Sequence, residues 1–155
     1  MRIRDILNQE AIQIQLDSSD KHEVIEKLVD IVSRANTLSN VDKLLDAVIE
    51  RESLMSTGVG KGVAIPHGKS EYINQLVAGF AVLHKGVDFG APDGIPVKIV
   101  ILMIASAQDT GPHIRALAHI SRILQAESLR EKLLLARSAK EIMDLLEERE
   151  EEIGS

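Results

Sequence analysis

The stretch Val97–Ala105, VKIVILMIA, decides the fold of this chain. Apolar residues, several of them β-branched, fill every position except Lys98, so polar and apolar side chains do not alternate. An uninterrupted run of this kind is typical of a strand that is buried on both faces. We therefore expect a central strand of a sheet that has helices on both sides.

Three further stretches are expected to be strands. Ala11–Leu16, AIQIQL, alternates apolar and polar residues with a period of two, which is typical of a half-buried strand. Val63–Pro66 and Gln75–His84 are short runs that are mostly apolar. These stretches supply neighbours for the central strand, but the sequence does not predict the order of the strands.

Helical periodicity precedes and follows these strands. Asp20–Ala35 repeats apolar residues along one helical face, and a second helix is expected to begin near Asn40. The apolar stripe of that second helix consists of Val41, Leu44, Leu45, Val48 and Ile49. Three more helices are expected to start near Pro112, Ser128 and Ser138, the last two with S-x-x-E capping boxes. The order predicts an α/β fold, one domain in which a β-sheet is sandwiched between helices.

Composition excludes several classes of function. The formal net charge is −6 over 155 residues, so no basic field exists that would favour nucleic acid. Only Tyr72, Phe80 and Phe89 are aromatic, fewer than proteins that stack bases or sugar rings usually carry. The acidity fits a partner with a basic patch, and it fits plain solubility equally well.

The chain shows no sign of export or membrane insertion. It has no cysteine, which excludes disulfides and thiolate chemistry, and no apolar run follows the charged N-terminus as in a signal peptide. The longest apolar segment, Ile99–Ala105, is far shorter than the ~20 residues that span a bilayer. We expect a cytoplasmic protein. The acidic stretch Glu147–Glu152 is interpreted as a solvated helix terminus.

The most unusual stretch is Ser56–Ser70, STGVGKGVAIPHGKS. Its end, Gly68-Lys69-Ser70, resembles the end of the phosphate-binding pattern G-x-x-x-x-G-K-[ST]. The first glycine of that pattern would fall at Val63, and the lysine precedes a strand instead of opening a helix. We therefore reject nucleotide binding through this motif.

His67 follows Pro66 and precedes Gly68, so a strand that ends in proline would hold the imidazole rigidly before a sharp turn. The glycines Gly58, Gly60 and Gly62 are able to direct backbone N–H groups into one concavity that binds an anion. A neutral imidazole offers one nitrogen as nucleophile. This combination suits transient phosphorylation of His67; the plainer alternative is an exposed histidine in a turn.

Arg51 continues the helical spacing of Val41, Leu44 and Val48 at the end of its helix. A guanidinium on that face would emerge where the helix meets the sheet edge, and its forked donors suit phosphoryl oxygens. The alternative is a cation that only stabilises the helix dipole, worth ~0.3–1 kcal/mol. Spacing does not separate the two interpretations.

His113 is expected in the first turn of a helix, where free N–H groups favour anions and the imidazole could donate to a phosphoryl group. The pattern alone favours the plainer interpretation, a polar residue without a chemical role. His119 lies about 120° further around the helix, so the two histidines do not share a face. We interpret His119, His22 and His84 as structural or surface residues.

Other chemistries fit the sequence less well. The histidines show neither H-x-x-x-H nor H-E-x-x-H spacing, so no metal site is expected, although the pair His67 and His113 with a carboxylate stays open. Ser56 and Thr57 lack the nucleophile elbow of serine hydrolases.

The residues that surround His67 match a known family. Arg51-Glu52-Ser53-Leu54, the stretch Ser56–Gly60 and Gly62-Val63-Ala64-Ile65-Pro66-His67 resemble the enzyme IIA domain of the phosphoenolpyruvate-dependent phosphotransferase system, fructose–mannitol type. This type includes the nitrogen-regulatory enzyme IIA. Val87–Phe89, Asp93–Val97 and His113–Leu124 also resemble the family, so the likeness covers nearly the whole chain.

The resemblance implies roles for individual residues. His67 would be phosphorylated on Nε2 by the phosphocarrier HPr or a paralogue, with Arg51, His113 and the Thr57 hydroxyl beside it. It also implies a mixed sheet flanked by helices, no metal, no nucleotide and no other cofactor. The domain would cover residues 1–150, with a short C-terminal tail at 151–155.

Two functions use His67 in the same way. In the first, the chain passes the phosphoryl group to an enzyme IIB for sugar uptake. In the second, it is a nitrogen-type regulator whose phosphorylation state changes its binding to target proteins. A chain without a IIB or membrane segment is expected to be a free-standing or regulatory IIA.

Overall fold

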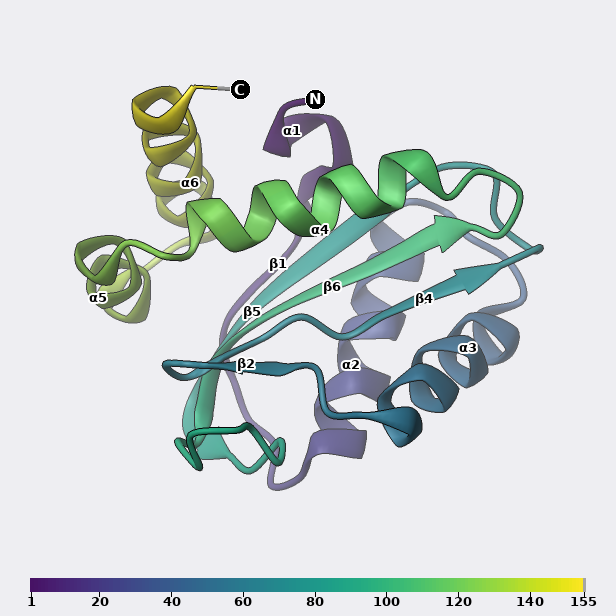
Figure 1. Ribbon diagram of the computed structural model, residues 1–155, viewed down its shortest axis with the longest axis horizontal. Coiled ribbons are helices and arrows are strands. Elements are labelled where there is room, and N and C mark those ends of the chain that lie inside the picture. The colour runs from purple at the N-terminus through teal and green to yellow at the C-terminus, as the bar shows by residue number, and fades with distance from the viewer. Residues whose placement is uncertain (155) are drawn as a thin grey trace.

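The computed structural model describes residues 1–154, which form one mixed sheet flanked by helices (Figure 1). The helices are α1 (Ile3–Ile6), α2 (Lys21–Ala35), α3 (Val41–Leu54), α4 (Gly111–Ile123), α5 (Glu127–Leu135) and α6 (Ala139–Ile153). The strands are β1 (Leu7–Leu16), β2 (Gly58–Gly60), β3 (Val63–Ala64), β4 (His67–Ser70), β5 (Val77–Val87) and β6 (Val97–Ser106). The predicted fold class is confirmed.

Strand β6 is central, as its apolar run predicts. The order in the sheet is β1-β5-β6-β3-β2, and β4 also pairs with β6. Strand β6 pairs antiparallel with β5 and parallel with β3 and β4, so it has a partner along both edges. Of its residues, only Lys98 and Ser106 are not buried.

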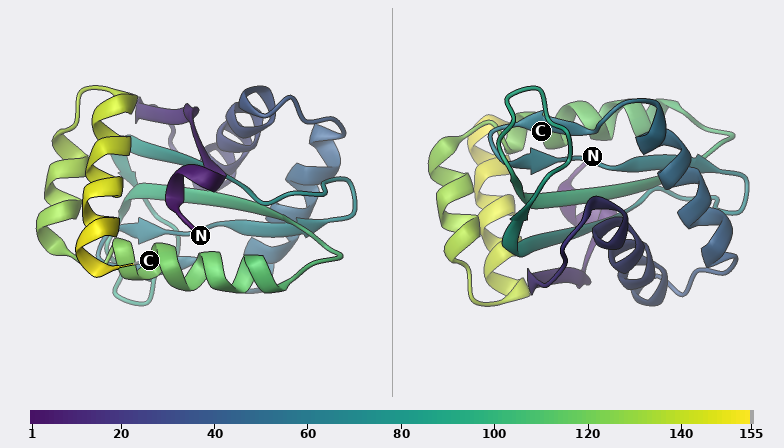
Figure 2. Two further views of the ribbon diagram at one scale, coloured as in Figure 1. Left: turned by 90° about the horizontal axis from the view of Figure 1, so that it is seen from above. Right: turned by 90° about the horizontal axis from the view of Figure 1, so that it is seen from below.

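The helices cover both faces of the sheet. Helices α2 and α3 pack on one face, against β1, β5 and β4, while α5 and α6 pack on the other, against β6 and β1. Figures 1 and 2 show α4 on the side opposite α2 and α3, with the strands between them. Strand β4 therefore runs between α3 and α4, and this position creates the site described below.

Helix starts were predicted with mixed success. Ser138 precedes α6 as expected, and its hydroxyl accepts a hydrogen bond of 3.1 Å from the Glu141 amide. The start near Ser128 was right to within one residue, but the capping box expected there was wrong, because α5 begins at Glu127 after Ala126 and Ser128 lies inside the helix. The start near Pro112 was right to within one residue.

The local structure around His67 differs from the expected strand end. Both β3 and β4 pair with β6, and Ile65-Pro66 only interrupts them, so His67 begins a strand instead of following one. Gly68 does not form a sharp turn. A Cβ atom at Gly68 would lie 3.0 Å from the backbone of Ala47 and Val48, so the glycine lets α3 approach the strand.

The acidic C-terminal stretch is only partly solvated. Helix α6 extends to Ile153. Glu150 is 2% exposed and accepts hydrogen bonds from the Ile3 amide at 2.7 Å and from His119 Nε2 at 2.5 Å. The carboxylate is buried because α6 packs against α1 and α4, and His119 has the structural role that was predicted.

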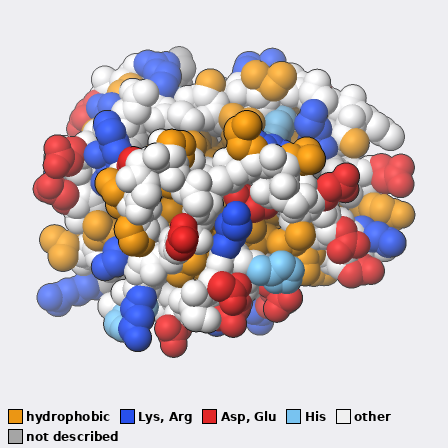
Figure 3. Space-filling view, turned by 60° about the horizontal axis from the view of Figure 1, so that its bottom comes forward, with side chains coloured by type: hydrophobic (Ala, Val, Ile, Leu, Met, Phe, Trp, Pro, Cys, Tyr) orange, Lys and Arg blue, Asp and Glu red, His pale blue; other side chains and the backbone are white. Residues whose placement is uncertain are grey.

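The surface carries charges of both signs. On the face shown in Figure 3, acidic and basic side chains are interspersed, with apolar side chains between them. Within residues 1–154, no helix is long and apolar enough to cross a membrane.

Candidate functional site

A pocket of about 540 Å³ opens where β4 passes between α3 and α4. Helix α3 contributes Arg51 and Leu54 to its lining, β4 contributes His67 and Lys69, and α4 contributes His113. Three of the residues singled out in the sequence thus share one pocket, although they come from three different elements.

The close contact between α3 and β4 places Arg51 beside His67. Because Gly68 has no side chain, the α3 backbone at Ala47 and Val48 lies directly over the strand. Arg51 is one helical turn further along α3 from Ala47 and therefore reaches the same end of the strand.

The His67 imidazole is fixed by its own backbone segment. Its Nδ1 lies 2.9 Å from the Ile65 carbonyl oxygen. A carbonyl oxygen only accepts, so Nδ1 carries the proton and Nε2 has a free lone pair. Within residues 1–154, Nε2 has no hydrogen-bond partner, and it is not among the buried unpaired atoms. This nitrogen therefore carries an accessible lone pair.

The surroundings of His67 favour its neutral form. Burial has the largest effect on its pKa and lowers it, and the nearby positive charges of Arg51 and Lys69 lower it further. The hydrogen bond to Ile65 and the negative charge of Glu52 act in the opposite direction, but the net pKa is below the usual value. The lone pair on Nε2 is therefore available at neutral pH.

His113 lies next to His67 and is almost completely buried. The two ring centroids are 5.2 Å apart, with the ring planes tilted by 52°. Burial, followed by the charges of His67 and Lys69, lowers the pKa of His113 to about 4. Its Nδ1 is buried and has no hydrogen-bond partner within residues 1–154. His113 is thus a neutral ring at neutral pH, with one N–H group to donate.

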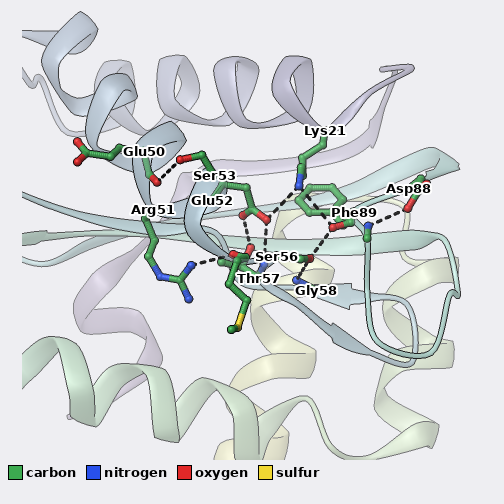
Figure 4. Close-up of polar contacts among 12 residues, drawn as sticks. Lys21, Glu50, Arg51, Glu52, Ser53, Ser56, Thr57, Gly58, Asp88 and Phe89 are labelled. Atoms are coloured by element: carbon green, nitrogen blue, oxygen red, sulfur yellow. Dashed lines mark hydrogen bonds and ion pairs between the residues drawn. The ribbon is translucent and has the colours of Figure 1, made fainter.

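Arg51 lines the pocket and also caps its own helix. One guanidinium nitrogen, Nη1, donates to the Met55 carbonyl oxygen at 2.8 Å (Figure 4). Within residues 1–154 the guanidinium forms no ion pair within 4.0 Å, so donors remain for an anion in the pocket. Both interpretations of Arg51 that the spacing allowed are compatible with this geometry.

Thr57 and the three glycines do not line the pocket. The Thr57 hydroxyl is buried and donates to Glu52 Oε1 at 2.5 Å. Gly60 and Gly62, with φ of +95° and +79°, form the tight turn between β2 and β3, and the Gly58 amide donates to the Ser56 hydroxyl. The structure therefore does not bring the expected anion-binding glycines to His67.

The sequence interpretation overlooked Glu52, which is 6% exposed. The signal was present: Leu44, Val48 and Glu52 follow at helical spacing, so the buried stripe of α3 ends in a carboxylate. A charge at such a position needs partners, and Glu52 has three donors from two segments.

The apolar residues between α3 and His67 differ in their exposure. Val59 is exposed, but Val63 and Ile65 belong to the core. The exposed apolar residues nearest Arg51 in the chain are Leu54 and Met55, with 77% and 71% of their surface exposed.

Within residues 1–154 no cluster of three or more histidine or carboxylate side chains is arranged to hold a metal ion.

Comparison with known proteins gives a consistent result. The family model described as "Phosphoenolpyruvate-dependent sugar phosphotransferase system, EIIA 2" matches residues 5–149. A fructose-specific EIIA component of Haloferax volcanii is 36% identical over 139 residues, which is 90% of each chain.

Two further matches differ in how much of the other protein they cover. The crystal structure of the nitrogen regulatory protein IIA-Ntr from Neisseria meningitidis superposes with a TM-score of 0.86 at 31% identity, covering 93% of this chain and 98% of that chain. The fructose-specific EIIABC component of Bacillus subtilis is 32% identical over 94% of this chain, but the chain spans only 23% of that protein.

Proposed function

This chain belongs to the EIIA type 2 family of the phosphoenolpyruvate-dependent sugar phosphotransferase system, and on that premise we propose that His67 is its phosphoryl carrier. The donor is the phosphocarrier HPr or a paralogue, and the acceptor is an enzyme IIB. The name of the Bacillus subtilis relative, EIIABC, supports a IIB unit as the next acceptor of the phosphoryl group. The reaction needs no cofactor and takes place in the cytoplasm.

The transfer step uses the lone pair on His67 Nε2. This nitrogen attacks phosphorus while the bond from phosphorus to the donor's imidazole nitrogen breaks, and the donor nitrogen keeps that electron pair. The proton on His67 Nδ1 stays in its hydrogen bond to the Ile65 carbonyl oxygen. Transfer to IIB is the same step in reverse, with the IIB nucleophile attacking the phosphorus.

The pocket supplies charge stabilisation for the moving group. Phosphoryl transfer requires mainly alignment and donors for the three equatorial oxygens. Arg51 has free guanidinium donors, His113 has one N–H group, and Lys69 brings a second positive charge to the rim. A guanidinium matches the geometry of two phosphoryl oxygens better than an ammonium group does.

One observation carries this proposal: the Ile65 carbonyl holds Nδ1 of His67 at 2.9 Å, so that Nε2 faces a pocket shared with Arg51 and His113. A histidine with only a packing role would not need a free nitrogen beside two potential phosphoryl-binding groups.

The test is phosphorylation in a purified system. The protein is incubated with labelled phosphoenolpyruvate, enzyme I and HPr, and acid-labile label on the chain is counted. We expect wild type to be labelled, His67→Ala to be unlabelled, and the surface control His84→Ala to match wild type. Equal labelling of wild type and His67→Ala would overturn the proposal.

A second function, nitrogen-type regulation, has its own support. The likeness to IIA-Ntr covers 98% of that chain with a TM-score of 0.86. In this role, phosphorylation of His67 controls binding to target proteins instead of serving sugar uptake. Transfer of label from the phosphorylated chain to a fructose-type IIB supports the carrier. A stable phosphorylated form that IIB does not discharge supports the regulator.

A further inference from the structure

Glu52 connects three segments through one buried carboxylate (Figure 4). Its Oε2 accepts from the Thr57 amide at 2.8 Å, and its Oε1 accepts from the Thr57 hydroxyl at 2.5 Å. Lys21 Nζ lies 3.4 Å from Oε2 and brings the start of α2 to the same point. Two bonds from one residue fix both the backbone and the side chain of Thr57.

The hydrogen bonds continue from Thr57 to the His67 ring. The Thr57 carbonyl oxygen accepts from the Ile65 amide at 3.0 Å, and the Ile65 carbonyl oxygen lies 2.9 Å from His67 Nδ1. Glu52, Thr57, Ile65 and His67 therefore form one continuous series, with one hydrogen bond or more at each step.

Each step restricts the next. Ile65 lies in the interruption between β3 and β4, where Pro66 has no N–H group to join the sheet. The Ile65 amide bonds to Thr57 instead, so Thr57 sets where the peptide of Ile65 lies. The direction of the Ile65 carbonyl then decides which nitrogen of His67 holds the proton.

We propose that Glu52 is a positioning residue for phosphoryl transfer, acting through Thr57 and Ile65 to keep the proton on His67 Nδ1 and to present Nε2 to the donor. The inference rests on the proposed function of His67. It assigns Thr57 a position within this series instead of a direct contact with the phosphoryl group.

The electrostatic effect of Glu52 points the same way. Its negative charge raises the pKa of His67 and so opposes part of the lowering caused by burial and by Arg51 and Lys69. A carboxylate in this place therefore orients the ring through Thr57 and Ile65 and makes it more basic.

A purely structural role for Glu52 makes a different prediction. The removal of one partner from a buried hydrogen-bond network lowers stability, whatever the network does. A merely structural Glu52 would lower the free energy of unfolding but leave the His67 tautomer unchanged. The tautomer of the unphosphorylated protein is therefore the deciding measurement.

The first experiment compares Glu52→Gln with the exposed control Asp46→Asn on the same helix. ¹⁵N NMR of the full chain gives the fraction of each His67 tautomer, and single-turnover phosphorylation by phospho-HPr gives the rate and the donor concentration for half-maximal rate. We expect wild type and Asp46→Asn to hold the proton on Nδ1. In Glu52→Gln we expect a several-fold rise of the Nε2–H tautomer and roughly a 10–100-fold slower transfer at unchanged half-saturation, the size expected for a small misplacement of a reacting group.

A second pair of variants covers the case in which Glu52→Gln does not fold. Thr57→Val keeps the shape and the amide of Thr57 but removes its hydroxyl, whereas Thr57→Ser keeps the hydroxyl. We expect Thr57→Val to shift the tautomer and slow transfer, and Thr57→Ser to restore both.

The outcomes separate this inference from the proposed function. If wild type accepts no phosphoryl group, the proposed function fails. If wild type is phosphorylated but folded Glu52→Gln and Thr57→Val keep its tautomer and its rate, the positioning role of Glu52 is overturned.

Discussion

The His67 and His113 rings lie 5.2 Å apart, and both have a lowered pKa. Burial is the main cause for each ring, and Lys69 contributes to both. Two histidines at this distance would repel each other if both were protonated. The pair is therefore neutral at neutral pH, and under the proposed function it receives a phosphoryl group without a prior loss of protons.

The free energy of unfolding should fall when His113 is protonated. The pKa of His113 is about 4 in the folded chain and about 6.5 in an unfolded one, so the unfolded state binds more protons between these values. The free energy of unfolding is then full above about pH 6.5 and decreases as the pH falls toward about 4, by up to about 3 kcal/mol. Urea unfolding at a series of pH values measures this slope.

The matched variants for this measurement are His113→Gln and His84→Gln, the latter at an exposed position. We expect His113→Gln to flatten the acid side of the profile and His84→Gln to leave it unchanged. Parallel profiles for wild type and His113→Gln would show that His113 is not the group that titrates.

The Arg51 guanidinium should contribute through its shape as well as its charge. Arg51→Lys retains a positive charge but loses the forked donors that match two phosphoryl oxygens. We expect Arg51→Lys to slow phosphorylation of His67 by roughly 10–100-fold and Arg51→Ala by about 100–1,000-fold, the range seen when a donor to a transition-state oxygen is removed. Rapid-quench measurement of label on His67 gives these rates, and an Arg51→Lys rate equal to wild type would contradict the bidentate role.

The contact between α3 and β4 depends on a glycine. A Cβ at Gly68 would lie 3.0 Å from the Ala47 carbonyl carbon and the Val48 amide nitrogen, both backbone atoms that cannot move alone. We expect Gly68→Ala to push α3 away from β4, to lower the free energy of unfolding by about 1–3 kcal/mol and to slow phosphoryl transfer. Chemical denaturation and the labelling assay measure the two effects.

Gly111→Ala is the control for that substitution. Its new Cβ would be 3.2 Å from the tip of the Arg115 side chain, which is flexible and able to move away. We expect a change in stability within about 0.5 kcal/mol. If both alanine variants unfold at the same denaturant concentration as wild type, close approach at Gly68 is not what fixes α3.

The sequence predicted the elements of the fold better than their local details. Val97–Ala105 is apolar along its whole length, and the structure confirms it as the central strand with helices on both sides. Periodicity contains no information on which strand lies beside which. The parallel pairing of β4 with β6 and the passage of β4 between α3 and α4 were for this reason not predictable.

The parts of the candidate site that were predictable are the residues whose side-chain chemistry suggests a role, the histidines and the arginine. His67, Arg51 and His113 were each singled out, and they do share a pocket. Gly58, Gly60 and Gly62 were grouped because they lie close together in the chain, but positive φ at a turn explains Gly60 and Gly62 without any ligand. The buried carboxylate of Glu52 was missed although Leu44, Val48 and Glu52 follow at helical spacing, and only its partner Lys21 comes from a segment that the fold alone brings near.

The exposed apolar side chain of Leu54 should serve carrier docking. It lines the His67 pocket and is 77% exposed at the end of α3. On the proposed function, we expect a partner that brings its phosphohistidine to Nε2 to cover it. Burial of such a side chain in a complex contributes about 1.5–3 kcal/mol, so we expect Leu54→Ser to raise the half-saturating concentration of phospho-HPr by roughly 10–100-fold. The maximal rate should not change, because Leu54 does not bind the phosphoryl group.

Leu135→Ser is the matched control, since Leu135 is 78% exposed on α5 and does not line this pocket. Equal half-saturation for both variants would place the docking surface elsewhere on the protein.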